Sequence, residues 1–361
     1  MTLERAGKTV RITDVAALAG VSIGTASKAL NGTGQLRDAT RERVKDAAEK
    51  LGFVGDARAR ALSSGRTYTV GMITTDSFGR FSIPVLLGAE DALSAGQMAV
   101  LLCDTRDDHV REAHYLRSLA ARGVDGIIVT GRSADARPPI DVPIPVVYAF
   151  TPSTDPDDVS VTLDDAAGSA RVAEHVLSTG RRRVAIVTGP ERHRSAVRRV
   201  CGAAEVLGAH LVAEPMYGEW SERWGRQAVD LLARGAGLGS TGTGTGAGTG
   251  AGIGTGVGVG SAPDGPGVDA IVCGSDQIAR GVCDRLRELG LAVPDDVAVT
   301  GFDDWDVMAL ASRPPLTTVD LRLEELGRVA GRALLDLIEG GAPVSATVTP
   351  SLVVRESTVG A

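Results

Sequence analysis

The residue types that most often carry catalysis or bind metals are few and scattered along this 361-residue chain. No cysteine belongs to a CxxC pair, and no HExxH or P-loop pattern occurs. The sequence therefore predicts no enzyme, no cofactor and no metal site. The wide spacing of the cysteines favours reduced, buried thiols over a disulfide framework. The residues concerned are His109, His114, His175, His193, His210, Cys103, Cys201, Cys273 and Cys283.

Charge is distributed unevenly along the chain, whose formal net charge is −7. Residues 1–66 contain 12 Lys and Arg against 7 Asp and Glu, so the rest of the chain is strongly acidic. A basic head on an acidic body indicates that only the head meets an anionic partner such as nucleic acid.

Three short helices are expected within residues 10–52. Thr13, Ser22 and Asp38 are the expected N-caps of these helices, and Gly20 is expected to end the first. A tight turn at residues 20–22 joins the first two helices. This layout is typical of a helix-turn-helix.

A second basic segment, FVGDARARALSSGR, occupies residues 53–66. Asp56 can cap a short helix over ARARAL. Because so short a helix is unstable alone in water, we expect it to fold only against a partner surface.

From Thr69 onward, apolar runs alternate with helical patterns, as in parallel βαβ units. The alternation restarts after residue 160, which predicts two similar α/β lobes with a cleft between them. Strands are expected at residues 70–74, 99–104, 125–131, 145–150, 183–189, 210–216, 269–276 and 297–304. Helices are expected near residues 82–95, 108–122, 164–179, 195–207, 221–234 and 277–289.

Residues 235–267 form a Gly-rich tract. Its chance GxGxxG strings neither follow a strand nor open a helix, so the tract predicts a flexible inserted loop and not a phosphate site. The N-terminus lacks the apolar run of a signal peptide, and no stretch is long and apolar enough to span a membrane. These features predict a cytoplasmic protein.

ITDVAALAGVSIGTASKALNG, at residues 12–32, resembles the headpiece of the LacI/GalR family of transcription regulators. The landmarks of that family follow in order: VDGIIVTG, GRRRVAIVTGP, CGSDQIARGV, VPDDVAVTGFDD, RPPLTTVD and LVVRESTV. The resemblance covers nearly the whole chain apart from the Gly-rich tract. It implies an α/β fold with an N-terminal helix-turn-helix headpiece, a hinge helix, and two Rossmann-like parallel-sheet lobes of the periplasmic-binding-protein type.

The resemblance places the second helix in the DNA major groove. Lys28 is the expected base reader, because an ammonium can donate to guanine O6 and N7; its alternatives are a phosphate contact or a solvated lysine. Ile23 suits a thymine methyl or a core position, and Gly24 departs from the polar residue common in the family. Ser22 suits an N-cap, a phosphate contact or both. The expected DNA-binding residues of this helix are Ser22, Ile23, Gly24, Thr25, Ser27, Lys28 and Asn31.

By the same resemblance, the ARARAL segment is a hinge helix that pairs with a second copy in the minor groove. Leu62 would wedge into a base step and kink the duplex, or alternatively pack against the core. Arg58 and Arg60 would face phosphates. Gly55-Asp56 stands where the family usually has Pro-Asn, which loosens the entry to the hinge.

The resemblance puts an effector between the two lobes. Arg199 matches the effector-binding arginine of the family, although the adjacent Arg198 is an alternative. Asp276 matches an acid that accepts hydrogen bonds from effector hydroxyls, or else it caps a helix. A forked donor and a bidentate acceptor both suit a polyol. The other expected effector residues are Asp76, Phe81, Phe150 and Trp220, of which Trp220 could also be plain core.

Three domains are therefore expected: a helix-turn-helix at residues 1–55, a hinge at 56–66, and a two-lobed core at 67–361. We expect a homodimer on a pseudo-palindromic operator, since one headpiece buries little surface. The predicted function is that of a repressor controlled by a small ligand, with a carbohydrate as the expected effector. Whether the ligand is an inducer or a corepressor stays open. The alternative function is a sugar-binding protein that does not act on DNA.

Overall fold

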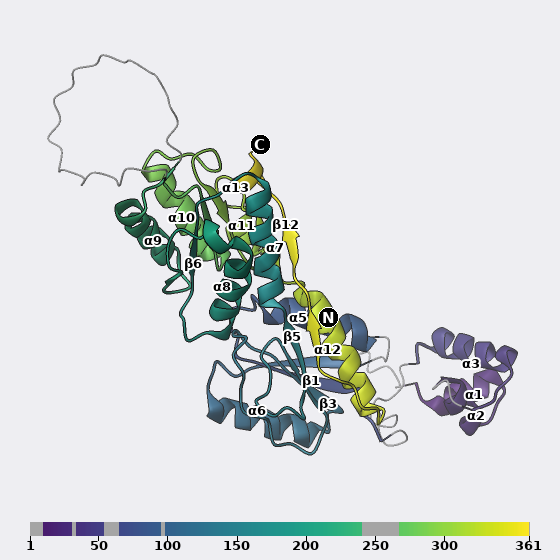
Figure 1. Ribbon diagram of the computed structural model, residues 1–361. Coiled ribbons are helices and arrows are strands. Elements are labelled where there is room, and N and C mark those ends of the chain that lie inside the picture. The colour runs from purple at the N-terminus through teal and green to yellow at the C-terminus, as the bar shows by residue number, and fades with distance from the viewer. Residues whose placement is uncertain (1–9, 31–33, 54–64, 95–97, 240–266, 361) are drawn as a thin grey trace, which may run out of the picture. The chain divides into compact units, whose positions relative to one another are not determined.

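The computed structural model describes residues 10–30, 34–53, 65–94, 98–239 and 267–360. The chain divides into two compact units, Met1–Tyr68 and Thr69–Ala361. Figure 1 labels helices of both units and several strands of the second.

The first unit is a bundle of three short helices. Val15, Ala26 and Val44 are fully buried where the helices meet, one from each helix. An apolar stripe on each helix is what drives such a bundle to form. The helices are α1 (Ile12–Ala19), α2 (Ile23–Leu30) and α3 (Asp38–Leu51). The predicted helix-turn-helix is confirmed.

The ends of α1 follow the sequence only in part. Gly20 ends the helix in the left-handed conformation at φ 63°, as predicted. The helix begins at Ile12, and the Asp14 carboxylate accepts a hydrogen bond from the Arg11 backbone N–H at 2.8 Å. Thr13 therefore lies inside the first turn, and its predicted capping role is wrong.

The other two helix starts differ from each other. Ser22 is the N-cap of α2, and its hydroxyl accepts the Thr25 backbone N–H at 3.1 Å. Asp38 is the first residue of α3, and Arg37 stands before it in extended conformation. The predicted cap at Asp38 is thus wrong by one residue; an acidic residue in the first turn still suits the helix dipole.

The first lobe of the second unit is built on a six-stranded parallel sheet, with order β11-β5-β4-β3-β1-β2. Helix α6 (His109–Arg122) covers one face, where Leu119 packs with Ile73 and Ile127. Helices α5 (Ser82–Ser94) and α12 (Leu323–Ile338) lie against each other, and α12 also packs on β3, β4 and β5. The strands are β1 (Thr69–Thr74), β2 (Ala99–Asp104), β3 (Gly126–Val129), β4 (Val146–Ala149), β5 (Val159–Leu163) and β11 (Ala346–Val348).

Helices α5 and α12 approach closely because a glycine faces the other backbone on each side. A Cβ on Gly88 would lie 1.8 Å from the carbonyl oxygen of Glu324, and one on Gly327 would lie 2.1 Å from that of Val85. Any larger residue at either position would push the helices apart. This contact fastens the C-terminal α12 to the first lobe.

The second lobe is built on a four-stranded parallel sheet with order β7-β6-β8-β9. Helices α9 and α10 pack on one face of the sheet, and α7 and α8 pack on the other. The strands are β6 (Val184–Thr188), β7 (Met216–Tyr217), β8 (Ala270–Cys273) and β9 (Ala298–Thr300). The helices are α7 (Asp165–Ser178), α8 (Arg194–Leu207), α9 (Glu222–Gly235) and α10 (Asp276–Glu288).

The predicted strand at residues 210–216 is largely wrong. Gly208–His210 forms a 3-10 turn, and only Met216–Tyr217 pairs as β7. Between these two segments only an isolated bridge joins Leu211 to Val184 of β6, and Pro215 cannot donate to a strand ladder.

After β9 the chain crosses between the lobes. The remaining elements are α11 (Asp306–Ala309), β10 (Thr318–Asp320), β12 (Ser351–Val353) and α13 (Glu356–Val359). Strands β10 and β12 pair antiparallel, whereas β11 between them in sequence joins the first sheet. The predicted α/β fold with two parallel-sheet lobes is confirmed. The predicted hinge helix and most of the Gly-rich tract lie outside the described residues.

Candidate DNA-binding and effector sites

Helix α2 buries Ala26 and Ala29 and turns its opposite side outward. Ile23 is 53% exposed, so the alternative core placement of this residue is wrong. Ser22, Gly24 and Lys28 are also exposed, and Thr25 and Ser27 are half-buried. The exposed side of α2, together with its N-cap, thus presents the combination that suits a groove: one apolar side chain, small polar groups and an ammonium.

The position of α2 is supported from the neighbouring segments. The aliphatic stem of Lys28 passes beside Gly34, where a Cβ would meet the lysine Cδ at 3.2 Å. Arg43 of α3 donates from Nε to the carbonyl of Ala19 at 3.0 Å, which ties α3 to the end of α1. The three-helix bundle therefore orients α2 before any partner is bound.

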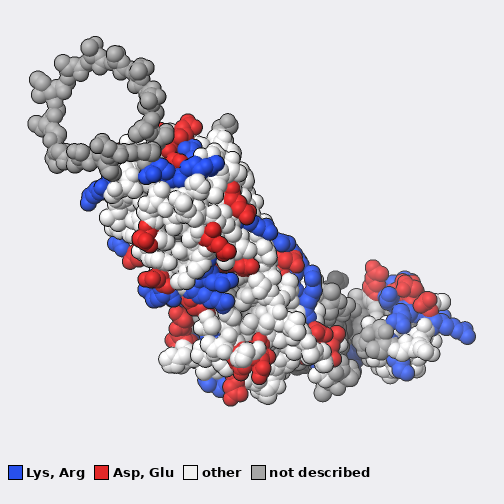
Figure 2. All heavy atoms as spheres, viewed as in Figure 1, with Lys and Arg blue, Asp and Glu red and all other residues white. Residues whose placement is uncertain are grey.

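Three of the predicted DNA-binding residues, Asn31, Arg58 and Leu62, lie outside the described residues. Figure 2 shows Lys and Arg on the visible surface of both units, with acidic side chains among them. On the face drawn in Figure 2, charge alone does not single out a DNA-binding surface, so the case for α2 depends on which side chains it exposes.

A cleft of about 1500 Å³ runs between the two lobes of the second unit. Five of the six predicted effector residues line it: Asp76, Phe81, Phe150, Arg199 and Trp220. The Phe81 and Phe150 rings stack with centroids 5.0 Å apart and an interplanar angle of 15°. Phe150 has φ 71°, a left-handed conformation that is uncommon for an aromatic residue and often marks a functional position.

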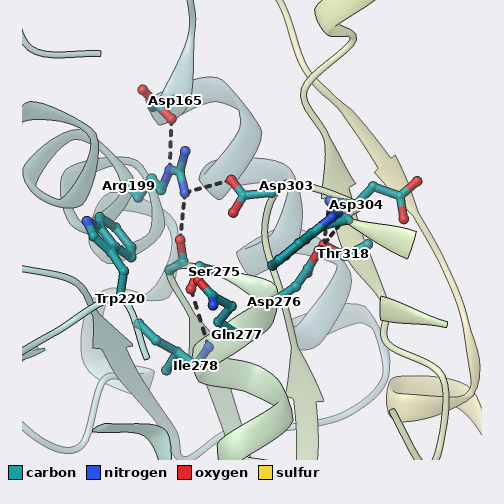
Figure 3. Close-up of polar contacts among 12 residues, drawn as sticks. Asp165, Arg199, Trp220, Ser275, Asp276, Gln277, Ile278, Asp303, Asp304 and Thr318 are labelled. Carbon is teal, nitrogen blue, oxygen red and sulfur yellow. Dashed lines mark hydrogen bonds and ion pairs between the residues drawn. The ribbon is translucent and has the colours of Figure 1, made fainter. Parts of the chain in front are cut away.

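Arg199 is the polar centre of the second-lobe wall (Figure 3). Its Nε donates to Asp165 at 2.8 Å, and Nη1 donates to the Gly274 carbonyl at 2.6 Å and to Asp303 at 3.2 Å. Burial alone would lower the pKa of Arg199, but the charges of Asp165 and Asp303 outweigh it and raise that pKa. The arginine stays charged, with its guanidinium held in one orientation.

The neighbouring Arg198 is exposed on the other side of α8 and does not line the cleft. Between the two adjacent arginines left open by the sequence, the geometry favours Arg199.

Asp76 lines the cleft, but its carboxylate already accepts hydrogen bonds from backbone N–H groups. Its carboxylate accepts the N–H groups of Phe81 at 2.7 Å and Ser82 at 2.9 Å, at the start of α5. The residue is only 6% exposed. Asp76 therefore positions Phe81, and an effector would compete with two backbone donors for its oxygens.

Asp276 is the one predicted effector residue that the structure does not place on the cleft wall. It is fully buried, and its carboxylate accepts the Trp305 backbone N–H at 2.7 Å and the Thr318 hydroxyl at 2.5 Å. Burial and the nearby charge of Asp303 raise the pKa of Asp276 to about 8. The cap of α10 is Ser275, which accepts the Ile278 N–H at 3.3 Å. Asp276 thus holds the loop that follows β9.

That loop carries two cleft residues that were not predicted from the sequence, Asp303 and Trp305. Asp303 pairs with Arg199 and also with Arg80, a third missed residue, which reaches across from the first lobe. One signal was available: Asp303 lies in the loop just after β9, a buried strand of a parallel sheet, and ligand sites gather at such carboxyl ends of strands. Arg80 carried no such signal beyond its place next to Phe81.

His193 is a further cleft residue that the sequence reading left unassigned. The Trp220 indole N–H donates to its Nδ1 at 2.9 Å. Because an indole N–H can only donate, Nδ1 must offer a lone pair, so the ring proton of a neutral His193 is on Nε2. Trp220 therefore lines the cleft and orients a second potential donor at the same time.

No helix within the described residues is both long and apolar enough to cross a membrane.

A helix-turn-helix unit followed by two parallel-sheet lobes with a polar, aromatic-lined cleft defines a particular class: a DNA-binding headpiece on a periplasmic-binding-type core. Family models match in the same order. Residues 11–56 match bacterial regulatory proteins of the lacI family, residues 67–216 match the periplasmic binding proteins and sugar binding domain of the LacI family, and residues 173–358 match a periplasmic binding protein-like domain.

Known relatives match over almost their whole length. The HTH-type transcriptional regulator CelR of Thermobifida fusca is 33% identical, over 95% of this chain and 96% of its own. A solved complex of the regulator CelR with cellobiose has a TM-score of 0.61 at 29% identity, over 96% of this chain and 99% of that one. The Lac repressor dimer bound to operator and the anti-inducer ONPF shares the fold, with a TM-score of 0.68 at 23% identity, over 98% and 100% of the two chains. The present chain belongs to the lacI family of bacterial regulatory proteins.

Proposed function

We propose that this protein is a cytoplasmic, sequence-specific DNA-binding repressor whose hold on its operator is controlled by a carbohydrate in the interlobe cleft. The observation that carries the proposal is the conjunction, in one chain, of an outward-facing recognition helix and a cleft lined by stacked aromatic rings, a fixed arginine and a carboxylate. The domain boundaries predicted from the sequence, 1–55, 56–66 and 67–361, are part of this proposal.

The DNA-binding half of the proposal rests on α2. Lys28 donates to a guanine edge, Ile23 presses on a thymine methyl, and Ser22 and Thr25 bind phosphate oxygens. Gly24 offers no side chain, which leaves one step of the operator weakly read. Ser27, Asn31, Arg58 and Leu62 complete the predicted contacts with DNA.

The effector half of the proposal rests on the chemistry of the cleft. Arg199 offers a fixed donor and Asp303 an acceptor, a pair that suits vicinal hydroxyl groups. The faces of Phe81, Phe150 and Trp220 suit the C–H faces of a sugar ring. We assign to Asp303 the acceptor role first predicted for Asp276, because the carboxyl oxygens of Asp276 already accept hydrogen bonds from Trp305 and Thr318.

A disaccharide is the effector size that we propose, because about 1500 Å³ is ample room for more than one sugar ring. The relative solved with cellobiose supports testing that sugar first.

We further propose that the protein is a homodimer. Apolar side chains lie exposed on α5 and on β2, which is an edge strand of its sheet. Leu87 is 48% exposed and Leu102 is 40% exposed, as befits a face that a second copy covers. The exposed apolar residues of these elements are Ile83, Leu87, Leu101 and Leu102.

Selection of DNA from a random double-stranded library by the full-length protein tests the proposed function. We expect enrichment of a pseudo-palindromic sequence, and a log affinity for it that falls steeply with log salt concentration. Enrichment of no sequence, together with tight binding of a sugar, would instead favour the alternative of a sugar-binding protein without a role on DNA.

A further inference from the structure

Arg80 is a cleft residue whose side chain joins the two lobes. It belongs to the loop between β1 and α5 in the first lobe, and its Nη2 donates to Asp303 of the second lobe. Its Nη1 donates to the side-chain oxygen of Gln277 at 3.3 Å, also in the second lobe. A guanidinium with both terminal nitrogens bonded across a cleft resists separation of the walls.

Two aromatic rings hold the guanidinium from the sides. The Cζ of Arg80 lies 4.3 Å from the centroid of the Trp305 ring and 4.8 Å from that of Phe81. A flat cation over aromatic faces gains cation–π attraction, more so when it is shielded from water. The arginine side chain is 15% exposed and its Asp303 partner 6% exposed, so this contact is largely dry.

The same arginine lines two hollows. The large cleft and a second hollow of about 650 Å³ share Arg80, Phe81, Asp303 and Trp305 as lining residues. Because Arg80 is already bonded to Asp303, an effector group that binds this carboxylate from the cleft must share it with the guanidinium or displace the guanidinium. The Nε of Arg80 is buried and has no hydrogen-bond partner among the described residues, so the arrangement leaves one donor unsatisfied.

We propose that Arg80 is an internal competitor of the effector: in the ligand-free protein its guanidinium occupies the place on Asp303, between Phe81 and Trp305, that a hydroxyl-bearing ring takes when the effector binds. This inference rests on the proposed function for the identity of the effector. The bridge from Arg80 to Asp303 and Gln277, which we call the latch, concerns the ligand-free chain alone. It predicts selectivity as well: the entering group must donate to Asp303 and present a flat face, so a carboxylate at that end of the ligand is rejected.

A second interlobe contact limits what removal of Arg80 can do. The carboxylate of Asp135, in the first lobe, accepts the Arg194 backbone N–H of the second lobe at 2.7 Å. Loss of Arg80 is therefore expected to widen the range of lobe separations and not to abolish all contact.

The matched control is Arg132→Gln. Arg132 also lines the cleft, but it pairs with Asp107 at 2.9 Å within the first lobe and makes no described bond to the second. Comparing Arg80→Gln with Arg132→Gln thus separates the loss of a bridge from the loss of a cleft arginine.

The experiment measures the distance between the lobes in the full-length, ligand-free protein by pulsed electron spin resonance. Spin labels are attached through Val110→Cys on α6 and Leu231→Cys on α9, both exposed, with serine replacing Cys103 and Cys201. An excess of unlabelled chain keeps the measured label pairs within one protomer. We expect Arg80→Gln to broaden and lengthen the distance distribution, and Arg132→Gln to leave it as in the parent. An unchanged distribution in Arg80→Gln overturns the proposal.

Should Arg80→Gln fail to fold, Arg80→Lys provides the same test. Lysine keeps the charge but cannot bond Asp303 and Gln277 as a fork or lie flat on Trp305. The proposal then expects a broadened distribution for this variant as well, and a parental distribution contradicts it.

Titration with cellobiose adds a second arm. Because the effector no longer has to displace a guanidinium, we expect Arg80→Gln to bind cellobiose about tenfold more tightly, a change that corresponds to about 1.4 kcal/mol. Weaker binding in Arg80→Gln makes Arg80 a ligand contact and overturns the competitor role. If cellobiose binds neither protein, the proposed effector fails while the distance measurement still decides the latch.

Discussion

The recognition helix and the effector cleft present their polar groups in opposite ways. On α2, Ile23 and Lys28 stand in solvent, and the bundle beneath them fixes their direction. In the cleft, Arg199, Asp303 and Arg80 are already bonded to one another or to nearby protein groups. Under the proposed function, DNA binding by α2 adds contacts to side chains that are already exposed, whereas ligand binding in the cleft must exchange one set of bonds for another. An exchange of that kind can move lobes, which is what a regulator requires.

The largest effect is expected where a bond of the cleft is broken without replacement. Arg199→Met leaves Asp165 and Asp303 without their shared guanidinium in a buried site, which should cost about 3–5 kcal/mol of unfolding free energy. Urea unfolding of the full chain measures it. Arg198→Met, one residue away and exposed, is the control and should change stability by no more than about 0.5 kcal/mol. Equal effects of the two substitutions would contradict the assigned network.

The carboxyl group behind the cleft should make stability depend on pH. The pKa of Asp276 is raised to about 8 in the folded protein. Between about pH 4 and pH 8, the folded state thus holds a proton that the unfolded state has lost, so the free energy of unfolding falls as pH rises through this range. Asp276→Asn should flatten that decline, as measured by urea unfolding at a series of pH values. A variant as steep as the parent would show that Asp276 is ionised in the fold.

A third substitution tests the exposed surface of α2. Lys28→Ala should reduce affinity for the selected operator by about 1–3 kcal/mol while leaving thermal stability unchanged. Lys50→Ala, exposed in the last turn of α3, is the control and should bind DNA as the parent does. Fluorescence anisotropy on the operator and on shuffled DNA measures both. Equal losses on the two DNAs would make Lys28 a phosphate contact instead of a base reader.

The smallest effect is expected from Trp220→Phe. The substitution keeps an aromatic face but removes the N–H that donates to His193, so affinity for an identified sugar should fall by about 0.5–1.5 kcal/mol. Trp220→Leu, which removes the ring as well, should cost more. Calorimetric titration compares them, and identical affinities of the two variants would remove Trp220 from the ring-stacking role.

The sequence predicted what depends on local pattern. Gly20 and Ser22 predicted the turn before α2 and the N-cap of α2. The alternation of apolar runs and helical patterns after Thr69 predicted two parallel-sheet lobes. The family resemblance then indicated that Arg199 and the aromatic residues Phe81, Phe150 and Trp220 line the same cleft. Each of these signals comes either from residues that are neighbours in the sequence or from motifs that follow one another in the order known for the family.

The parts that the sequence did not predict depend on contacts between distant segments. Helix α12 belongs to the first lobe because Gly88 and Gly327 let two backbones touch, a relation across more than half the chain. Asp276 and Asp303 are both aspartates and lie close together in the fold. Only their hydrogen-bond partners show that Asp276 supports the loop after β9 and that Asp303 lines the cleft. Arg80 acquires its role from Asp303 and Gln277 of the other lobe, which no local pattern near residue 80 reveals.

The central claim is that a sugar between the lobes and an operator on α2 influence each other through one molecule. The most direct test measures the affinity of the full-length protein for cellobiose, or for the sugar that a wider screen identifies, with and without saturating operator DNA. The account predicts that operator changes the sugar affinity, and that sugar changes the operator affinity by the same factor, because linkage between two sites is reciprocal. A sugar affinity that is the same with and without operator would contradict it.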